Sequence, residues 1–293
     1  MKRYVILAVT FLVVSVVAAW GWVSFGAPYM TKIPNDFSYK VEQIARDNIG
    51  GAMDSSQAEN VNKATLSYDV VKVTGNVLTI KGIFEDRRAD GSLIFGSEQL
   101  YGVDALTGKH VIGVGSADRT GYFFAPKFLK KGQEFTYWYL NLDKAAHMKF
   151  VGVEDLQGLE VYKYQTDYEK SAQDQTAFMG FVPGVPEKYG IKLETINTVW
   201  IEPVSGFMVA ESDWSTDYYF YDIKTEQRVK SYNAFKDVYS DESIKKNVAI
   251  ATELKAKNLF AYQTVPIIGV AALAVIFLAI GFVMKKKGIT PVV

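Results

Sequence analysis

The chain has 293 residues, of which 49% are hydrophobic and 14% aromatic, and this length allows one large domain or two smaller ones. Lys and Arg number 32, and Asp and Glu also number 32, so a formal net charge of zero excludes a basic field that would attract nucleic acid. Cysteine is absent, which excludes disulfides, thiolate nucleophiles and cysteine-ligated metal sites.

An uncharged apolar segment occupies residues 4–24, directly after Lys2 and Arg3. About 20 apolar residues, each rising ~1.5 Å along a helix, match the ~30 Å hydrocarbon core of a bilayer. Small residues at 17–19 would also allow a cleaved signal peptide. The apolar run is longer than a signal-peptide core and ends in tryptophans, which suit the membrane interface. We therefore expect an uncleaved signal anchor, the first transmembrane helix.

Residues 26–240 are predicted to form a mainly β extracytoplasmic domain, because short stretches of alternating apolar and polar residues are separated by turn signals. One short helix is expected at 38–47, and the less regular stretch 171–195 is expected to be a loop or cover segment. A strand pair is predicted on the two sides of Gln157 and Gly158. Four hairpins are predicted, with turns at residues 74–76, 104–108, 202–206 and 222–226.

Three of these turns share a sequence pattern, in which an acid is followed three residues later by Ser or Thr and usually then by Gly. The acids are Asp104, Glu202 and Asp222. An acidic side chain can accept hydrogen bonds from the backbone N–H groups of a tight turn, and Gly tolerates the positive φ that follows. We therefore interpret these acids as turn-forming residues.

The spacing of apolar residues changes from that of strands to that of a helix at residue 241. Asp241 is available as the N-cap, and the apolar residues that recur at helical spacing are Ile244, Val248, Ala251 and Leu254. This pattern predicts an amphipathic stalk helix at 241–263, which leads directly toward a second apolar segment.

The second apolar segment lies at residues 265–284, and three lysines at 285–287 follow it at once. Its length and lack of charge predict a second transmembrane helix. Basic residues flank the outer ends of both apolar segments, and cytoplasmic loops are enriched in Lys and Arg. We therefore predict a plasma-membrane protein with both termini in the cytoplasm, including a short tail at 285–293, and with the β domain outside.

Four blocks of the predicted β domain are informative together: residues 103–108, Tyr137 with Trp138, residues 141–164, and residues 198–206. Their order resembles the Porin PorA family of actinobacteria and archaea, and the resemblance covers most of the chain. The family name implies a pore. A β-barrel pore needs many ~10-residue strands that face lipid, whereas this chain offers two apolar helices, which cannot enclose a pore in one copy. A channel would therefore require an oligomer.

A second likeness rests on residues 150–152 and 158–162, followed by residues 199–202, which are similar to LolA-like lipoprotein carriers. In that family a curved antiparallel sheet wraps helices and shelters lipid chains. The resemblance implies an open half-barrel with a hydrophobic cavity. The fold class expected is thus a curved antiparallel sheet, as a half-barrel or a sandwich, flanked by two transmembrane helices.

Motifs for catalysis and for metal or cofactor binding are missing from the sequence. His110 and His147 lack metal-ligand spacing, and residues 85–92 lack the order of a calcium loop. Neither a Gly-x-Ser-x-Gly motif nor a phosphate-binding loop occurs. We therefore predict a protein that is not an enzyme and has no cofactor. The alternative is an enzyme that uses scattered carboxylates such as Glu154 and Glu202.

Aromatic residues cluster at 122–128, 135–139 and 214–221. A core with cross-strand aromatic pairs would explain them, and so would a surface that binds lipid, glycan or a partner. Consecutive strand residues point to opposite faces, so the run at 218–221 cannot all be buried on one side of a sheet. The predicted binding surface comprises Tyr122, Phe124, Trp138, Trp214, Tyr219 and Tyr221.

These patterns together predict a membrane-anchored protein of the cell envelope. Its extracytoplasmic domain is expected to be a non-enzymatic binding or scaffold module for lipid, an envelope polymer or a partner protein. The lipid bilayer is an expected partner, together with a second copy of the chain or another membrane protein, and nucleic acid is not. The alternative function is the oligomeric membrane channel that the family name implies.

Overall fold

The computed structural model describes residues 2–47, 60–139, 144–166, 169–171 and 185–286. The chain forms two compact units. One combines residues 1–32 with residues 254–293, and the other spans Ile33–Glu253.

Helices make up the described part of the first unit. Helix α1 (Lys2–Gly21) continues through a π-helical turn, η1 (Trp22–Gly26), into α2 (Ala27–Met30). Helix α4 (Asp241–Leu259), of which residues 254–259 belong to this unit, likewise continues through η3 (Phe260–Thr264) into α5 (Val265–Lys286). The stretches Ala8–Met30 and Asp241–Met284 are long and apolar enough to cross a membrane, which confirms the prediction of an apolar helix near each end.

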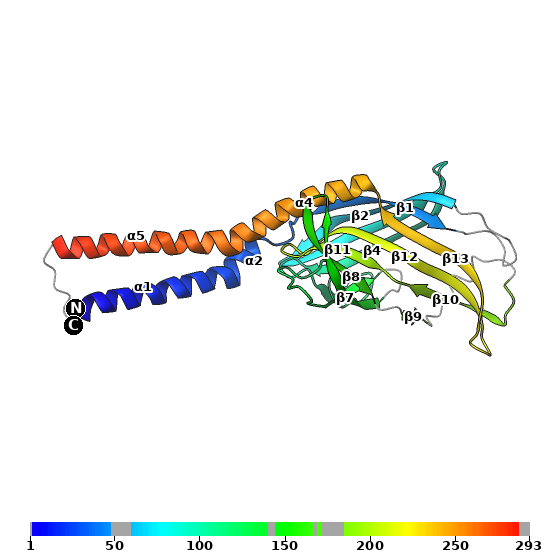
Figure 1. Ribbon diagram of the computed structural model, residues 1–293, viewed down its shortest axis with the longest axis horizontal. Coiled ribbons are helices and arrows are strands. Elements are labelled where there is room, and N and C mark those ends of the chain that lie inside the picture. Colours follow the sequence, from blue (N-terminus) through cyan, green and yellow to red (C-terminus); the bar gives the residue numbers. More distant parts are fainter. Residues whose placement is uncertain (1, 48–59, 140–143, 167–168, 172–184, 287–293) are drawn as a thin grey trace. The chain divides into compact units, whose positions relative to one another are not determined.

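Helices α1 and α5 lie side by side in this unit (Figure 1). The rings of Phe11 and Phe277 meet edge to face with centroids 5.3 Å apart. The indole Nε1 of Trp22 donates a hydrogen bond of 2.7 Å to the Ala261 carbonyl. This bond joins the two π-helical turns. Many other apolar side chains of the pair are exposed.

A large antiparallel sheet forms the second unit, and it curves without closing (Figure 1). The strand order is β5-β4-β3-β2-β1-β13-β12-β11-β8-β7-β6, and β10 pairs with β12 and β9. The strands are β1 (Ser38–Asp47), β2 (Asn60–Thr74), β3 (Val77–Arg87), β4 (Leu93–Asp104), β5 (His110–Gly115), β6 (Phe135–Tyr139), β7 (Lys144–Leu156), β8 (Leu159–Thr166), β9 (Glu169–Ser171), β10 (Tyr189–Thr195), β11 (Thr198–Glu202), β12 (Phe207–Asp222) and β13 (Arg228–Tyr239). The prediction of a mainly β fold built on an open curved sheet is confirmed.

The two end strands of the sheet are linked by a short segment at residues 121–123. Tyr122 forms one isolated bridge to Lys109, beside β5, and another to Tyr137 in β6. The Tyr122 N–H donates to the Thr136 carbonyl at 2.9 Å, and the Phe123 N–H donates to the Gly108 carbonyl at 2.8 Å. The two ends of the curved sheet are therefore held near each other although they do not pair directly.

All four predicted hairpins form, as does the strand pair around Gln157 and Gly158. The three acid-containing turns share one geometry: an acid accepts hydrogen bonds from its own turn, and the carbonyl of the acid accepts a bond from the N–H four residues later. That fourth residue has positive φ in each turn, at Gly108, Gly206 and Glu226. The interpretation of the acids as turn-forming residues is confirmed.

Two local predictions are wrong. Residues 38–47, expected to be a helix, form β1, because pairing with β2 and β13 on its two edges outweighs local helix propensity. Buried side chains alternate there with period two, at Val41, Gln43 and Ala45. Within the stretch 171–195, expected to be a loop, β10 forms because its edge pairs with the long strand β12. Residues 172–184 of that stretch lie outside the described residues.

Helix α4 begins where β13 ends, and the part of it in this unit packs on the sheet. Its N-cap is Ser240 rather than the predicted Asp241, since the Ser240 hydroxyl accepts from the Ser243 N–H at 3.2 Å. Asn247, fully buried, donates through Nδ2 to the Tyr39 hydroxyl at 2.9 Å and to the Val209 carbonyl at 3.0 Å. These bonds fix the helix against β1 and β12, next to the tyrosine cluster described below.

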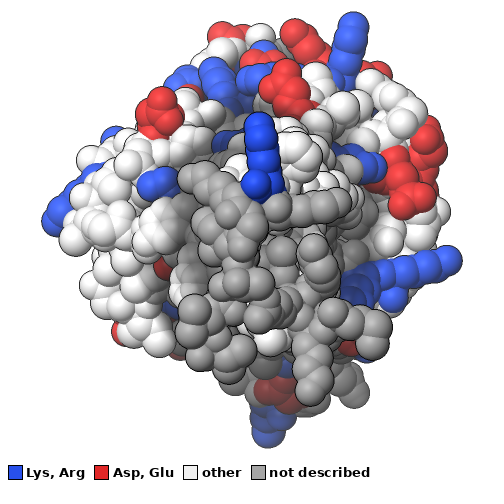
Figure 2. All heavy atoms as spheres, turned by 90° about the vertical axis from the view of Figure 1, so that its left-hand side faces the viewer, with Lys and Arg blue, Asp and Glu red and all other residues white. Residues whose placement is uncertain are grey.

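Charged side chains of both signs lie on the surface of the molecule. On the face shown in Figure 2, Lys and Arg are interspersed with Asp and Glu around the rim. This mixed arrangement agrees with the net charge of zero and does not form an extended field of one sign over the described part of that face.

Candidate functional site

A small cavity of about 60 Å³ lies on the inner side of the curved sheet. Nine of its lining residues are aromatic: Tyr39, Tyr68, Tyr101, Tyr137, Tyr239, Phe123, Phe124, Phe207 and Trp138. Leu66, His110, Met208 and Glu211 complete the lining. The cavity therefore has an aromatic wall with a few polar groups, which is the usual composition of a small-molecule site.

The lining residues come from strands that are far apart in the sheet order. Tyr68 belongs to β2, Tyr101 to β4, Tyr137 to β6, Met208 to β12 and Tyr239 to β13. Curvature of the sheet brings these strands together, because residues two apart on a strand share a face and the inner faces converge. The 121–123 segment, which links the two ends of the sheet, places Phe123 against the same space.

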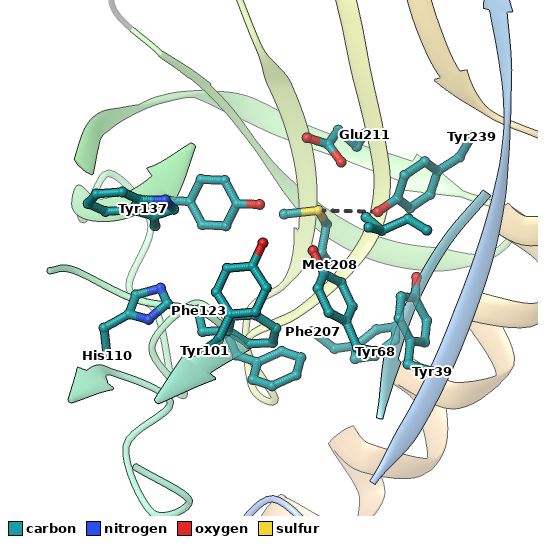
Figure 3. Close-up of a pocket in the computed structure, with 13 residues that line it drawn as sticks. Tyr39, Tyr68, Tyr101, His110, Phe123, Tyr137, Phe207, Met208, Glu211 and Tyr239 are labelled. Carbon is teal, nitrogen blue, oxygen red and sulfur yellow. Dashed lines mark hydrogen bonds between the residues drawn. The ribbon is translucent and has the colours of Figure 1, made fainter. Parts of the chain in front are cut away.

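The tyrosine side chains point their hydroxyl groups toward one region of the cavity. Figure 3 shows the hydroxyls of Tyr68, Tyr101 and Tyr137 directed at the space beside Met208. The Tyr239 hydroxyl lies 3.7 Å from the Met208 sulfur. Edge-to-face ring contacts fix the orientation of Tyr68, whose ring centroid is 6.0 Å from Tyr101 and 4.9 Å from Phe123.

Glu211, on β12, is the acid that faces this region. Burial raises the pKa of its carboxyl to about 7, and repulsion from Asp213 acts in the same direction. Hydrogen bonds from Asn197 and Tyr239 act against this increase, the Asn197 amide being 2.8 Å from Oε1. Glu211 keeps some accessible surface because it borders the cavity. Near neutral pH its carboxyl is therefore divided between the neutral and the ionised form.

A second acid, Asp213, lies two residues further along β12 and is satisfied by protein groups. The Tyr139 hydroxyl donates to its Oδ2, and the Thr195 hydroxyl donates to its Oδ1 at 2.8 Å. Burial raises the pKa of Tyr139 well above its usual value, and the charge of Asp213 adds to this effect. The phenol thus stays protonated and remains a donor to the carboxylate.

His110 and Trp138 form the other end of the cavity. Burial lowers the pKa of His110 to about 4, and the charge of Arg119 lowers it further, so the imidazole is neutral at pH 7. Within the described part of the chain, the buried Trp138 Nε1 makes no hydrogen bond. Arg119 lies over the rings of Tyr101 and Trp138, at 4.5 and 5.7 Å from their centroids.

Two of the six residues of the predicted binding surface, Phe124 and Trp138, line the cavity. Tyr122 instead packs against a core cluster with Lys109 over its ring. Tyr219 and Tyr221 have Arg228 and Lys192 over their rings. Trp214 lies in β12, and its side chain is outside the described residues. The structure does not bring the six together, and their role in binding stays a prediction.

The alternation expected for residues 218–221 is present. Tyr218 packs in a buried cluster with Tyr139 and Leu193, whereas Tyr219 and Tyr221 meet the cations of the neighbouring strands. Aromatic residues of one run therefore serve two different faces of the sheet.

Sequence reasoning missed the central residues of the cavity, namely Tyr39, Tyr68, Tyr101, Tyr239 and Glu211. Tyr39 and Tyr68 are each the single aromatic residue of their strand, and Tyr101 and Tyr239 lie four or more residues from the other aromatic residues of theirs, so clustering along the sequence did not reveal them. Glu211 carried a signal: together with Asp213 it places two acids on one face of the strand, directly after the apolar run Phe207–Ala210. Pairs of this kind are a reason to suspect a buried acid with a shifted pKa.

The two carboxylates of the enzyme alternative hold separate local structures. Glu154 is exposed, pairs with Lys163 at 2.9 Å and accepts from the Trp200 indole at 2.7 Å. Glu202 is fully buried and accepts hydrogen bonds within its own turn. Among the described residues, no group of three or more His, Asp or Glu is placed to hold a metal ion.

Comparisons with known proteins bear on the family. Comparison with curated proteins gave no match. Among solved structures, a protein with a YmcC-like fold from Bacteroides fragilis is 10% identical, with a TM-score of 0.34, covering 71% of this chain and 96% of that one. A DUF1329 family protein from Desulfovibrio piger is 9% identical, with a TM-score of 0.19, covering 76% of this chain and 90% of that one. A sequence model described as Porin PorA matches residues 4–283, so the chain belongs to the Porin PorA family.

Proposed function

We propose that this chain is a membrane-anchored protein of the cell envelope whose β unit is a non-enzymatic binding module, with the tyrosine-lined cavity as its ligand site. The observation that carries this proposal is the convergence of tyrosine hydroxyls and Glu211 inside an otherwise aromatic cavity. Polar groups that meet in an apolar cavity are costly unless a partner satisfies them, and a ligand is such a partner.

The size of the cavity limits the kind of ligand. A volume of about 60 Å³ has room for about four water molecules, whereas sites for drug-sized ligands are several times larger. The cavity would therefore receive one small polar end of a lipid or of an envelope polymer. The rest of such a molecule would remain outside.

Anchoring rests on the two apolar helical stretches and on the basic residues at their outer ends. Lys2 and Arg3 precede the first stretch, and three lysines at 285–287 follow the second. Positive-inside bias then favours cytoplasmic termini, a plasma-membrane location and an extracytoplasmic β unit. Glu211 and the cavity would face the envelope in this orientation.

Cysteine labelling tests this orientation cleanly, because the natural sequence has no cysteine. Lys224→Cys introduces a thiol in the exposed turn between β12 and β13, and Thr290→Cys introduces one near the C-terminus. A membrane-impermeant maleimide should label the first variant and not the second in intact cells. The opposite labelling pattern would reverse the proposed topology.

Ligand occupancy of the cavity is tested by native mass spectrometry of the full chain purified from its own membranes. We expect a co-purifying small molecule or lipid on the natural chain. Leu66→Trp should abolish it by filling the cavity, whereas Val71→Trp adds the same ring at an exposed position of the same strand and should not. Equal retention of the ligand by both variants would show that the cavity is not the site.

The family description supports a second candidate function, a channel formed by several copies. The two apolar helices of one chain cannot enclose an aqueous pore, so the oligomer would have to line it. Purified full chain in planar bilayers should then give discrete conductance steps. Silent bilayers that contain folded protein would leave the binding module as the remaining proposal.

A further inference from the structure

Among the described residues, the one charged group that shifts the pKa of Glu211 is an acid. Asp213 repels it from two residues away on β12. The charge of Glu211 in turn helps to raise the pKa of five tyrosines, although burial is the largest cause in each: Tyr39, Tyr68, Tyr137, Tyr139 and Tyr239. These residues come from β1, β2, β6 and β13, so acidic groups face Glu211 from several directions.

A basic partner for Glu211 does not occur among the described residues. Arg119, at the far end of the cavity, is buried and donates to the Leu100 carbonyl at 2.9 Å and to Gln99. His110 stays neutral because burial lowers its pKa to about 4. The ionised form of Glu211 therefore has one amide and one phenol as donors but lacks a counterion within this part of the chain.

The space next to Glu211 is rich in hydrogen-bond acceptors. Figure 3 shows the hydroxyl oxygens of Tyr68 and Tyr137 directed into it, together with the sulfur of Met208. A phenol oxygen accepts hydrogen bonds as well as donating one, and a carboxylate only accepts. The complement of this wall is a group that carries positive charge and several N–H donors.

We propose that the cavity beside Glu211 binds a primary ammonium group, whose charge pairs with the carboxylate and whose N–H bonds reach the tyrosine oxygens. This inference rests on the proposed function, since it names the ligand chemistry of the same cavity. An ammonium has three donors, which matches the carboxylate and two phenol oxygens. A Ca²⁺ or Mg²⁺ ion fits poorly, because these ions take six or more oxygen ligands, usually with more than one carboxylate.

Proton linkage gives the proposal a quantitative signature. An ammonium group binds the ionised form of Glu211, and an alkylammonium stays protonated below about pH 9. Since burial raises the pKa of Glu211 to about 7, the ionised fraction falls roughly tenfold between pH 8 and pH 6. Affinity for the ammonium should fall by about the same factor over that range.

The test compares two probes of equal size on the full chain in detergent micelles. Ethanolamine hydrochloride carries the ammonium, and ethane-1,2-diol with matched sodium chloride replaces it by a neutral hydroxyl. Binding is followed by tryptophan fluorescence, because Trp138 lines the cavity. We expect ethanolamine to bind at least tenfold more tightly than the diol at pH 8, with this preference about tenfold smaller at pH 6.

Substitutions test whether Glu211 causes the preference for ethanolamine over the diol. Glu211→Gln keeps the shape of the side chain and should remove both the preference and its pH dependence. Glu98→Gln, on the exposed end of a surface ion pair with Lys81, should leave both unchanged. Leu66→Trp should block both probes. Circular dichroism and unfolding midpoints establish that each variant is folded.

Each outcome decides something. Equal binding of amine and diol, blocked by Leu66→Trp, would overturn the ammonium assignment while supporting the binding cavity. A preference for amine that survives Glu211→Gln would also overturn it. Absence of binding by either probe would overturn the assignment, and native mass spectrometry would still judge the cavity as a ligand site. In nanodiscs, competition between ethanolamine and phosphatidylethanolamine, but not phosphatidylcholine, would assign the ammonium to a lipid head group rather than to a free amine.

Discussion

Two glutamates lie nine residues apart on one hairpin: Glu202 is fully buried, and Glu211 is partly buried beside the cavity. Glu202, in the turn between β11 and β12, accepts hydrogen bonds from the Ser205 N–H and hydroxyl, both at 2.7 Å, and from the Val204 N–H at 3.2 Å. Glu211, on β12, receives the Asn197 amide and the influence of Tyr239, and burial raises its pKa to about 7. The first is held by its own turn, and the second faces a cavity.

The difference teaches that burial alone does not identify a functional acid. A carboxylate recovers the hydration it loses through the donors that surround it. Glu202 has several donors within three residues, so its charge serves the fold. Glu211 has few such donors and lies beside the cavity, so a ligand can supply the hydrogen bonds that the protein does not.

In the turn that holds Glu202, the free energy of unfolding should be especially sensitive to an added side-chain atom. Gly206 has φ +73°, and a Cβ added there would lie 2.1 Å from the Ala125 carbonyl oxygen. Gly206→Ala should therefore lower the free energy of unfolding by at least about 3 kcal/mol, through both backbone strain and overpacking. Gly75 has φ +61° and open space around it, so Gly75→Ala should cost about 1 kcal/mol. Chemical denaturation of the full chain measures both, and equal losses would contradict the close packing of the turn.

Glu211, beside the cavity, should make the free energy of unfolding depend on pH. Burial raises the pKa of Glu211 from 4.5 to about 7, so the folded state binds its proton more tightly than the unfolded state does. The stabilisation that this proton gives is complete below about pH 4.5 and is lost as pH rises through 7, by on the order of 3 kcal/mol. Glu211→Gln should remove this slope, whereas Glu98→Gln should keep it.

A second group titrates in the same window with the opposite sign. The pKa of His110 is lowered to about 4, so its contribution to stability is lost as pH falls below about 6.5. The informative quantity is therefore the difference between Glu211→Gln and the natural chain at pH 5, 6, 7 and 8. A difference that does not vary with pH would show that Glu211 is ionised throughout.

A smaller loss is expected for Glu202→Gln. The amide can accept a hydrogen bond on one arm, but its NH₂ group would oppose the Ser205 or Val204 donors on the other. We expect a loss of roughly 2 kcal/mol in the free energy of unfolding, because buried donors are left without an acceptor. Asp155→Asn is the matched control, since exposed Asp155 accepts from the Gly158 N–H at 2.8 Å and water can replace this bond. Similar losses in both variants would remove the distinction between a buried and an exposed turn acid.

Much of the fold was predictable because the signals were local. Alternating apolar residues and turn residues identified the hairpins, and two long uncharged runs identified the apolar helices. Residues 38–47 were mistaken for a helix because their strand character comes from pairing with β2 and β13, which are distant in sequence. Long-range pairing of this kind leaves little trace in a single segment.

The cavity was less predictable for the same reason. Phe124 and Trp138 were found because aromatic residues cluster near them in sequence, yet Tyr122 in the same cluster faces a different core. Tyr39, Tyr68 and Tyr239 reach the cavity only through the curvature of the sheet, which no local pattern specifies. The clearest sequence signal for the site is the pair of acids Glu211 and Asp213. Their strand was predicted from the hairpin with its turn at residues 202–206, and the two acids played no part in that prediction.

The smallest expected effect concerns the third acid-containing turn, which has Glu226 where the other two have glycine. Glu226 has φ +59° and pairs with Lys192. Glu226→Gly should relieve about 1 kcal/mol of backbone strain and lose an exposed ion pair that contributes at most about that much, so a net gain of ~0.5 kcal/mol is expected. Glu226→Ala loses the ion pair and keeps the strain, so it should be the less stable variant by about 1 kcal/mol. If unfolding midpoints placed alanine level with glycine, backbone strain at this position would contribute little to the stability of the turn.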